Sequence, residues 1–86
     1  MFYVYVLKGR SRSYFYTGCT NDLKKRFAEH NGKMVRSTIP YVPFDIIYYE
    51  ACLNGVDAYR REKYLKTRLG KSYLRKRLKN WEDKLA

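Results

Sequence analysis

The first twenty residues carry a pattern that predicts a β-hairpin. Phe2–Leu7 is rich in aromatic and β-branched residues, which favour strands. Residues 9–13 are small or charged and predict a turn, and residues 14–19 form a second run typical of a strand. Both faces of this hairpin are apolar or aromatic, so we expect the sheet to be covered on both sides.

A helical pattern follows the hairpin. Asn21 or Thr20 can cap a helix that runs to about His30, and Gly32 would stop it. At about 100° per residue, one stripe of this helix would pack on the sheet. That stripe holds Leu23, Phe27 and the chain's only histidine, His30, with Arg26 at its edge.

The second half of the chain predicts one more strand and two helices. Lys33–Pro43 is expected to be irregular, because its two prolines block a regular helix or central strand. Phe44–Ala51 is typical of a strand. Asn54 can cap a long helix that ends near Gly70, and Lys71–Lys79 predicts a further short basic helix.

One acidic residue interrupts the apolar stripe of the long helix. Ala58, Glu62, Leu65 and Leu69 project within roughly 60° of one another. An unpaired carboxylate in such a stripe is costly to bury. Glu62 therefore requires a metal ion, a cationic partner or water at a cleft.

The net charge of the chain indicates what kind of partner it binds. The 86 residues, 45% of them hydrophobic, predict a single domain. The net charge is +11, and the stretch from Arg60 to Lys79 holds ten basic residues against Glu62 alone. Such clustering points to a polyanion, either nucleic acid or an anionic membrane surface, although a solubilising surface is an alternative.

The composition also indicates in which cellular compartment the protein is expected. No apolar run reaches the roughly 18 residues that a membrane span needs, and Phe2–Leu7 is too short for a secretory signal. Cys19 and Cys52 lack the spacing and histidine partners of a zinc site. We therefore expect a cytoplasmic protein in which both cysteines are reduced and act as small hydrophobic residues.

The polar residues of these elements suit chemistry on a phosphodiester. Such cleavage needs an oriented water, a proton acceptor, a cation near the phosphate and usually Mg²⁺ or Mn²⁺. Glu62 can ligate the metal, Arg26 can bind the phosphate, and Tyr5, Tyr16 or His30 can hold or deprotonate the water. Each residue also has a purely structural explanation, namely sheet packing, a buried core histidine or a buried Arg–Glu pair.

The order of these residues resembles the GIY-YIG endonuclease superfamily. Tyr3-Val4-Tyr5 and Tyr16-Thr17-Gly18 stand for its two tripeptides, and Arg26, His30 and the segment Ala58–Lys66 follow at the expected places. The likeness is greatest to short standalone members related to the UvrC N-terminal nuclease domain, and it covers Phe2 to about Lys79. The sequence departs from the family at both central isoleucines, at the first glycine and at Cys19, where lysine is frequent; Asn80 lies too far along to serve as the family's asparagine.

The resemblance implies an α/β (α+β) fold. It would be a single small domain with a three-stranded antiparallel sheet flanked by helices, in the order β-β-α-β-α-α. It further implies one Mg²⁺ or Mn²⁺ ion on Glu62, and tyrosines Tyr5 and Tyr16 that orient or deprotonate the water. Arg26 would contact the scissile phosphate and His30 would assist a tyrosine. Gly18 would let the backbone pass close to the site.

We therefore expect a metal-dependent DNA endonuclease of repair or recombination. The alternatives are a non-catalytic nucleic-acid-binding module with the same fold and, more remotely, a basic protein of a membrane surface or the ribosome. The expected partner is DNA, structured or damaged, with no membrane, and both a monomer and a weak dimer remain open. The cations expected to contact phosphates are Lys25, Arg36, Lys66, Lys71, Arg75, Lys76 and Arg77.

Overall fold

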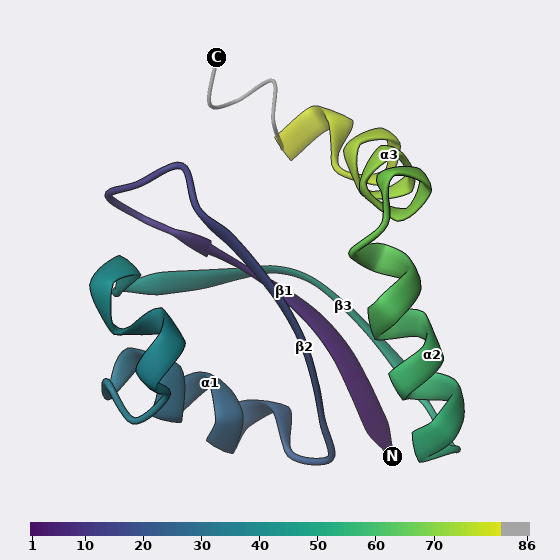
Figure 1. Cartoon of the computed structure of the whole chain (residues 1–86), viewed down its shortest axis with the longest axis horizontal. Helices are drawn as coiled ribbons and strands as arrows, with labels where there is room; N and C mark the ends of the chain where they lie inside the picture. Colours follow the sequence, from purple (N-terminus) through teal and green to yellow (C-terminus); the bar gives the residue numbers. More distant parts are fainter. Residues whose placement is uncertain (82–86) are drawn as a thin grey trace.

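The computed structural model describes residues 1–81 and contains one three-stranded antiparallel sheet in the order β2-β1-β3 (Figure 1). The central strand β1 (Phe2–Gly9) pairs with β2 (Phe15–Thr20) on one side and β3 (Phe44–Cys52) on the other. This confirms the predicted hairpin, the third strand and the α+β fold. The expected core, residues 2–79, lies within the described part, whereas residues 82–86 of the expected domain lie outside it.

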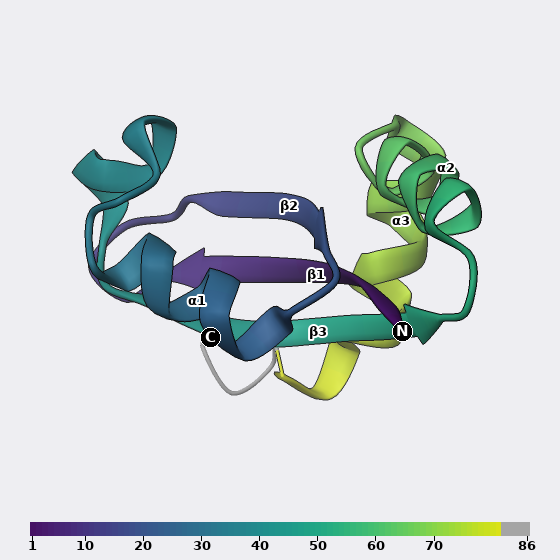
Figure 2. The same cartoon turned by 90° about the horizontal axis from the view of Figure 1, so that it is seen from below.

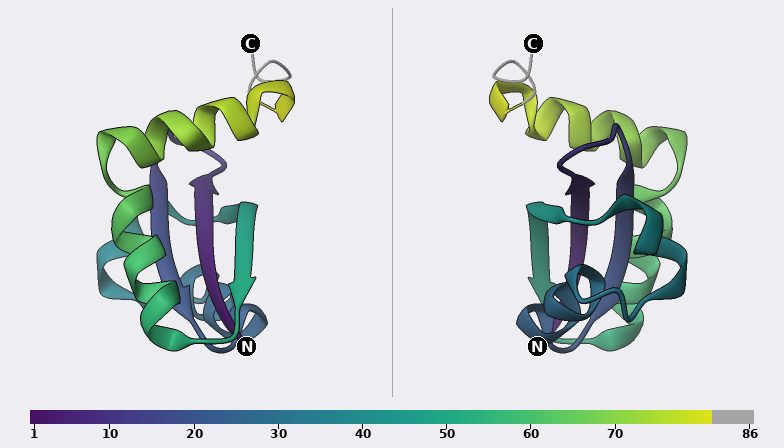
Figure 3. Two further views of the ribbon diagram at one scale, coloured as in Figure 1. Left: turned by 90° about the vertical axis from the view of Figure 1, so that its right-hand side faces the viewer. Right: turned by 90° about the vertical axis from the view of Figure 1, so that its left-hand side faces the viewer.

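Helices cover both faces of the sheet (Figures 2 and 3). On one face lie α1 (Leu23–Asn31) and a short 3-10 helix, η1 (Arg36–Tyr41). On the other lie α2 (Gly55–Leu65) and α3 (Arg68–Arg77). The central strand is buried on both sides, because Tyr5 and Leu7 belong to one core cluster and Val4 and Val6 to another. The two-sided burial predicted from the sequence is therefore confirmed.

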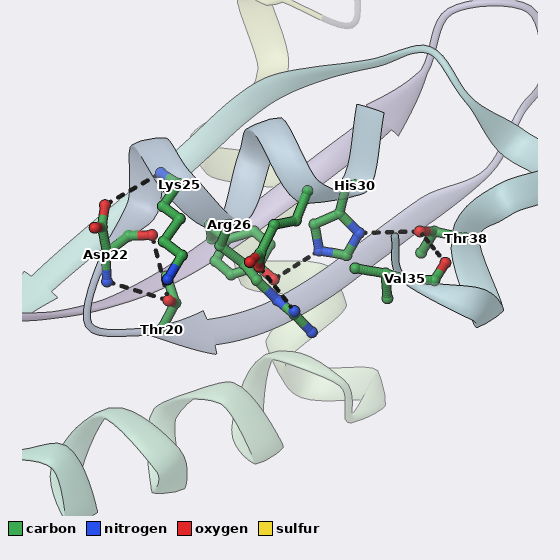
Figure 4. A network of polar contacts seen from close by, with 9 residues as sticks. Thr20, Asp22, Lys25, Arg26, His30, Val35 and Thr38 are labelled. Atoms are coloured by element: carbon green, nitrogen blue, oxygen red, sulfur yellow. Dashed lines mark hydrogen bonds and ion pairs between the residues drawn. The ribbon is translucent and has the colours of Figure 1, made fainter. Parts of the chain in front are cut away.

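The first helix begins one residue later than a cap at Asn21 would place it. Its N-cap is Asp22, whose carboxylate accepts a hydrogen bond from the Lys25 backbone N–H at 3.1 Å. Thr20 ends β2, and its hydroxyl accepts from the Asp22 backbone N–H at 3.1 Å (Figure 4). The prediction of Thr20 or Asn21 as the cap was wrong, because Thr20 shapes the turn that precedes the cap.

The segment expected to be irregular contains η1. Its helical turn is closed in part by the Thr38 backbone N–H, which donates to the Val35 carbonyl at 3.0 Å. Pro40 lies inside η1 despite lacking an N–H. A 3-10 piece this short loses only one hydrogen bond to such a residue, so the proline did not prevent the turn.

The long second helix predicted from the sequence is two helices. The first ends at Leu65, and Thr67 caps α3 by accepting from the Gly70 backbone N–H at 3.1 Å. Gly70 lies buried within α3, where a Cβ atom would overlap the backbone carbonyl of Tyr64. Gly70 therefore permits close packing of α3 on the end of α2. Because the chain turns there, Leu69 is 66% exposed and does not continue the apolar stripe as predicted.

A polar network fixes these helices to β3. Both carboxylate oxygens of Glu50 accept from Arg61 at 2.9 to 3.1 Å, and one also accepts from the Tyr48 hydroxyl at 2.7 Å. The Tyr73 hydroxyl of α3 lies 3.1 Å from that of Tyr48. Burial favours a higher pKa for Glu50, but the hydrogen bonds from Arg61 and Tyr48 outweigh it and lower the pKa. Glu50 is therefore an ionised carboxylate that bonds to α2 through Arg61 and is linked to α3 through the hydroxyls of Tyr48 and Tyr73.

The two cysteines lie beside the core cluster on the α2 side of the sheet. Cys19 and Cys52 are free thiols and pack against the buried residues of that cluster. This packing agrees with their expected role as small hydrophobic residues. Among the helices within residues 1–81, none is long and apolar enough to cross a membrane.

Candidate active site

Strand pairing places the phenol of Tyr5 over a glycine. Tyr5 lies directly opposite Gly18 in the β1–β2 ladder and is 1% exposed. A Cβ atom on Gly18 would collide with the Tyr5 ring and would lie 2.9 Å from the Tyr16 ring. The bare backbone of Gly18 therefore lets the Tyr5 side chain lie across β2. This agrees with the role that the family resemblance implies for that glycine.

The hydroxyl of Tyr5 begins a buried chain of hydrogen bonds. It lies 2.9 Å from Nε2 of His30, and Nδ1 of His30 lies 3.0 Å from Oγ1 of Thr38. The Thr38 hydroxyl donates onward to the Val35 carbonyl at 3.1 Å (Figure 4). The Thr38 hydroxyl uses its only proton in the bond to the Val35 carbonyl. It must therefore accept the hydrogen bond from Nδ1–H of His30. Nε2 is then unprotonated, and Tyr5 donates to it.

Burial sets the protonation states of Tyr5 and His30 in this series of hydrogen bonds. It raises the pKa of Tyr5 to about 12, a shift that Arg26 opposes and that Tyr16 and Glu62 reinforce. Burial also lowers the pKa of His30, and the charge of Arg26 lowers it further. At neutral pH the pair is therefore a neutral phenol and a neutral imidazole. The imidazole is a proton acceptor in direct contact with the phenol.

Arg26 and Tyr16 border this pair. Arg26 extends from α1 and donates to Glu29 at 3.1 Å, a contact that raises the pKa of the guanidinium (Figure 4). The ring centroid of Tyr16 lies 4.8 Å from that of His30 and 6.2 Å from that of Tyr5. Among the described residues, none forms a hydrogen bond with the Tyr16 hydroxyl. That hydroxyl and the outer N–H groups of Arg26 are thus available to a ligand.

The carboxylate of Glu62 belongs to α2, which covers the other face of the sheet from α1. Its side chain is 16% exposed and accepts from Lys66 Nζ at 2.6 Å, a bond that raises the pKa of the lysine. Of the three explanations for an acid in the apolar stripe, the structure provides the cationic partner. Glu62 is also close enough to Tyr5 to raise the pKa of the phenol. Of the predicted residues, the structure brings together Tyr5, Tyr16, Arg26 and His30, whereas Glu62 lies on α2 and acts on Tyr5 through its charge.

The donor atoms available for a metal are few. Within residues 1–81, no three His, Cys, Asp or Glu side chains form a group that could hold an ion by themselves. Mg²⁺ requires less, because it keeps several water ligands and binds to one or two carboxylates together with substrate phosphates. The shielded carboxylate of Glu62 fits that manner of binding, with the charge of Lys66 as its competitor.

The cations predicted to contact phosphates do not form one patch. Lys25 and Arg36 are exposed on α1 and η1, whereas the other five lie on the α2–α3 side of the sheet. These five residues do not all lie together either. Arg77 is near enough to Glu50 to lower its pKa, and Lys76 is exposed on α3. The remaining three, Lys66, Lys71 and Arg75, line one pocket beside Tyr16.

The sequence did not point to Thr38. This residue is fully buried and fixes which nitrogen of His30 carries the proton. It belongs to the segment whose prolines predicted irregular structure, and a lone threonine there has no pattern that distinguishes it. The contact depends on how η1 packs against α1, which periodicity cannot show.

Comparisons with known proteins agree with this arrangement. The family model of the GIY-YIG catalytic domain matches residues 1–81. A UPF0213 protein of Clostridium perfringens is 42% identical over 67 residues, covering 77% of this chain and 71% of that protein. A UPF0213 protein of Oceanobacillus iheyensis is 37% identical over 65 residues, covering 74% of each. The solution NMR structure of a UPF0213 protein from Bacillus halodurans superposes with a TM-score of 0.52 at 32% identity, covering 86% of this chain and 82% of that chain.

Proposed function

Because this chain belongs to the GIY-YIG catalytic domain family, we propose that it is a divalent-metal-dependent endonuclease that hydrolyses DNA phosphodiester bonds. The observation that carries the proposal is the buried contact between Tyr5 and His30, with the charges of Arg26 and Glu62 acting on the phenol. A structural tyrosine has no need of a neutral imidazole acceptor on its hydroxyl, nor of a guanidinium and a carboxylate whose charges act on it. A group that exchanges protons near a phosphate has a use for all three.

The proton path follows from the hydrogen bonds. A water near the Tyr5 hydroxyl can give its proton to the phenol oxygen as the phenol proton moves to Nε2 of His30. The phenol thus never has to ionise by itself, which its raised pKa would oppose. Thr38 keeps the imidazole in the tautomer that can accept. In the product state His30 is a cation, and Tyr5 is again neutral.

The remaining residues act on the phosphate. Arg26 is oriented by Glu29 and supplies charged donors to the oxygens that gain negative charge. Tyr16 presents a free hydroxyl beside the same spot. Glu62 would hold one Mg²⁺ or Mn²⁺ ion, which would neutralise phosphate charge and make a bound water more acidic. A role in DNA repair or recombination is part of the proposal, supported by the likeness to UvrC-type domains.

Nicking of supercoiled plasmid tests this function. Wild-type protein with Mg²⁺ or Mn²⁺ should convert the plasmid to open circles, and Glu62→Gln should reduce the rate by at least about 100-fold, in line with loss of a metal-assisted step. Asp57→Asn is the matched control, because it makes the same change at an exposed position of α2 and should keep the activity. If wild type cleaves no DNA faster than Glu62→Gln with either metal, the proposal is wrong.

One observation favours a second candidate, a nucleic-acid-binding module without turnover. Lys66 already neutralises Glu62 at 2.6 Å, and a metal ion must compete with it. A binding module predicts that DNA affinity is independent of divalent metal and falls steeply with salt. Binding of that kind, without product from any DNA, would select this candidate over the enzyme.

A further inference from the structure

A concave surface adjoins the candidate active site. It is a pocket of about 660 Å³ on the α3 side of the sheet, within the roughly 300–1,000 Å³ that ligand sites occupy. Side chains of Val6 and Ile47 come from the sheet, and those of Leu65 and Leu74 from the helices. The site and the pocket share Tyr16 at the edge of β2, so a ligand can reach both.

An exposed aromatic ring forms one wall of this pocket. Phe15 is the first residue of β2 and is 49% exposed, although strand residues of this kind are normally covered. Within residues 1–81 its ring stacks on no other aromatic side chain. Phe15 therefore offers exposed ring surface to a planar ligand.

The rim of the pocket is basic. Lys71 and Arg75 from α3 line it together with Lys66, the C-cap of α2, which is paired with Glu62; among residues 1–81 no acidic side chain lines it. Lys71 and Arg75 are one helical turn apart and exposed, so both can contact anions at the mouth. An apolar interior with an aromatic wall and a cationic rim matches a nucleobase flanked by its phosphates.

We propose that this pocket takes an unpaired nucleobase, so that the preferred substrate has a nucleotide outside the double helix next to the scissile phosphate. The inference rests on the proposed nuclease function and specifies its substrate. Bases within a duplex are stacked and expose only their edges in the grooves. Only an extrahelical or single-stranded base offers a face to Phe15. Its phosphates would then lie between the rim and Arg26.

Fluorescence anisotropy with two labelled DNAs tests the pocket. One is a short perfect duplex, and the other is the same duplex with a single bulged thymidine. Both are titrated with wild-type protein in EDTA, so that no metal-dependent cleavage occurs. We expect tighter binding to the bulged DNA by about 5- to 150-fold, the range that stacking of one base on an aromatic ring provides.

Three variants assign the preference to the pocket. Phe15→Ala removes the ring, and Phe15→Leu keeps apolar contact but offers no π face; both should bring the bulge-to-duplex affinity ratio towards one. Tyr49→Ala is the matched control, since Tyr49 is an aromatic residue of β3 that is 56% exposed and lies outside the pocket. It should retain the wild-type ratio.

The outcomes separate this inference from the proposed function. Equal affinity of wild type for the two DNAs, or an unchanged ratio in both Phe15 variants, overturns the pocket assignment even if the protein nicks plasmid. Preferential bulge binding without cleavage of the bulged DNA or of plasmid in Mg²⁺ or Mn²⁺ supports the pocket and refutes the nuclease. A dimer in light scattering that Phe15→Leu dissociates would show that a second copy occupies the pocket, and the assignment would be wrong.

Discussion

Removal of the Thr38 hydroxyl is the most direct test of the proton path. Thr38→Val keeps the shape of a fully buried side chain and removes one donor and one acceptor. The Val35 carbonyl loses the hydroxyl but still accepts from the backbone N–H of residue 38 at 3.0 Å, so it stays satisfied. The group that loses its hydrogen-bond acceptor is Nδ1–H of His30, which then has no partner inside the core.

The cost follows from that single group. A buried donor without a partner costs about 1–3 kcal/mol, and urea denaturation should show a loss of this size in the free energy of unfolding. His30 can escape part of the cost by moving its proton to Nε2. That tautomer cannot accept from Tyr5, so the single-turnover nicking rate should fall by about 5- to 150-fold, the equivalent of the same free energy.

A serine variant and a tautomer measurement exclude a packing effect. Thr38→Ser keeps the hydroxyl and loses a methyl group, so it should retain most of the wild-type rate. Nitrogen NMR of the imidazole shows which ring atom carries the proton in each protein. A valine variant that keeps the wild-type tautomer, stability and nicking rate would refute the hydrogen-bond direction inferred for this chain.

Three further outcomes are expected. Gly18→Ala forces a Cβ atom against the Tyr5 ring and should cost about 1–3 kcal/mol in thermal denaturation together with most of the nicking activity; an alanine variant of wild-type stability and rate would contradict the contact. The pKa of His30 is lowered in the folded protein, so the unfolded chain binds more protons in acid. Stability should therefore be constant above about pH 6.5 and should decline below it, and a His30→Gln variant should lack that decline in urea titrations. Glu50→Gln removes the charge that receives Arg61, and with both side chains about one-third exposed the expected loss in urea denaturation is about 1 kcal/mol; no loss would mean that the network is not stabilising.

Much of the fold follows from local pattern. The strands were predictable because aromatic and β-branched residues fill them, and α2 because Asn54 caps it as expected. The break after Leu65 was not predictable, because apolar periodicity continues to Leu69 through the turn. The Thr67 cap and the close packing of Gly70 on the backbone of Tyr64 accompany the bend, and the apolar pattern shows neither.

The candidate site shows the same division. Helical periodicity placed His30 towards the sheet and Glu62 in its stripe; in the structure His30 contacts Tyr5, and the charge of Glu62 acts on the phenol. Periodicity could not reveal Thr38, since its contact crosses from one helix to another. Nor could it show that Lys66 pairs with Glu62 instead of lying free for phosphate, because i,i+4 spacing permits either outcome.

The pairing of Tyr5 with Gly18 also has a consequence for how this chain can change in length. The hairpin connection at residues 10–14 supplies no group to this chain of hydrogen bonds, although its Tyr14 stacks on Tyr41 of η1. Inserted residues that loop outward and keep this stacking leave the phenol where it is. The connection between α1 and β3 is different, because it must bring Thr38 back to the imidazole that Tyr5 contacts. A peptide tag or sensor domain belongs in the first connection, and the second has to keep its length.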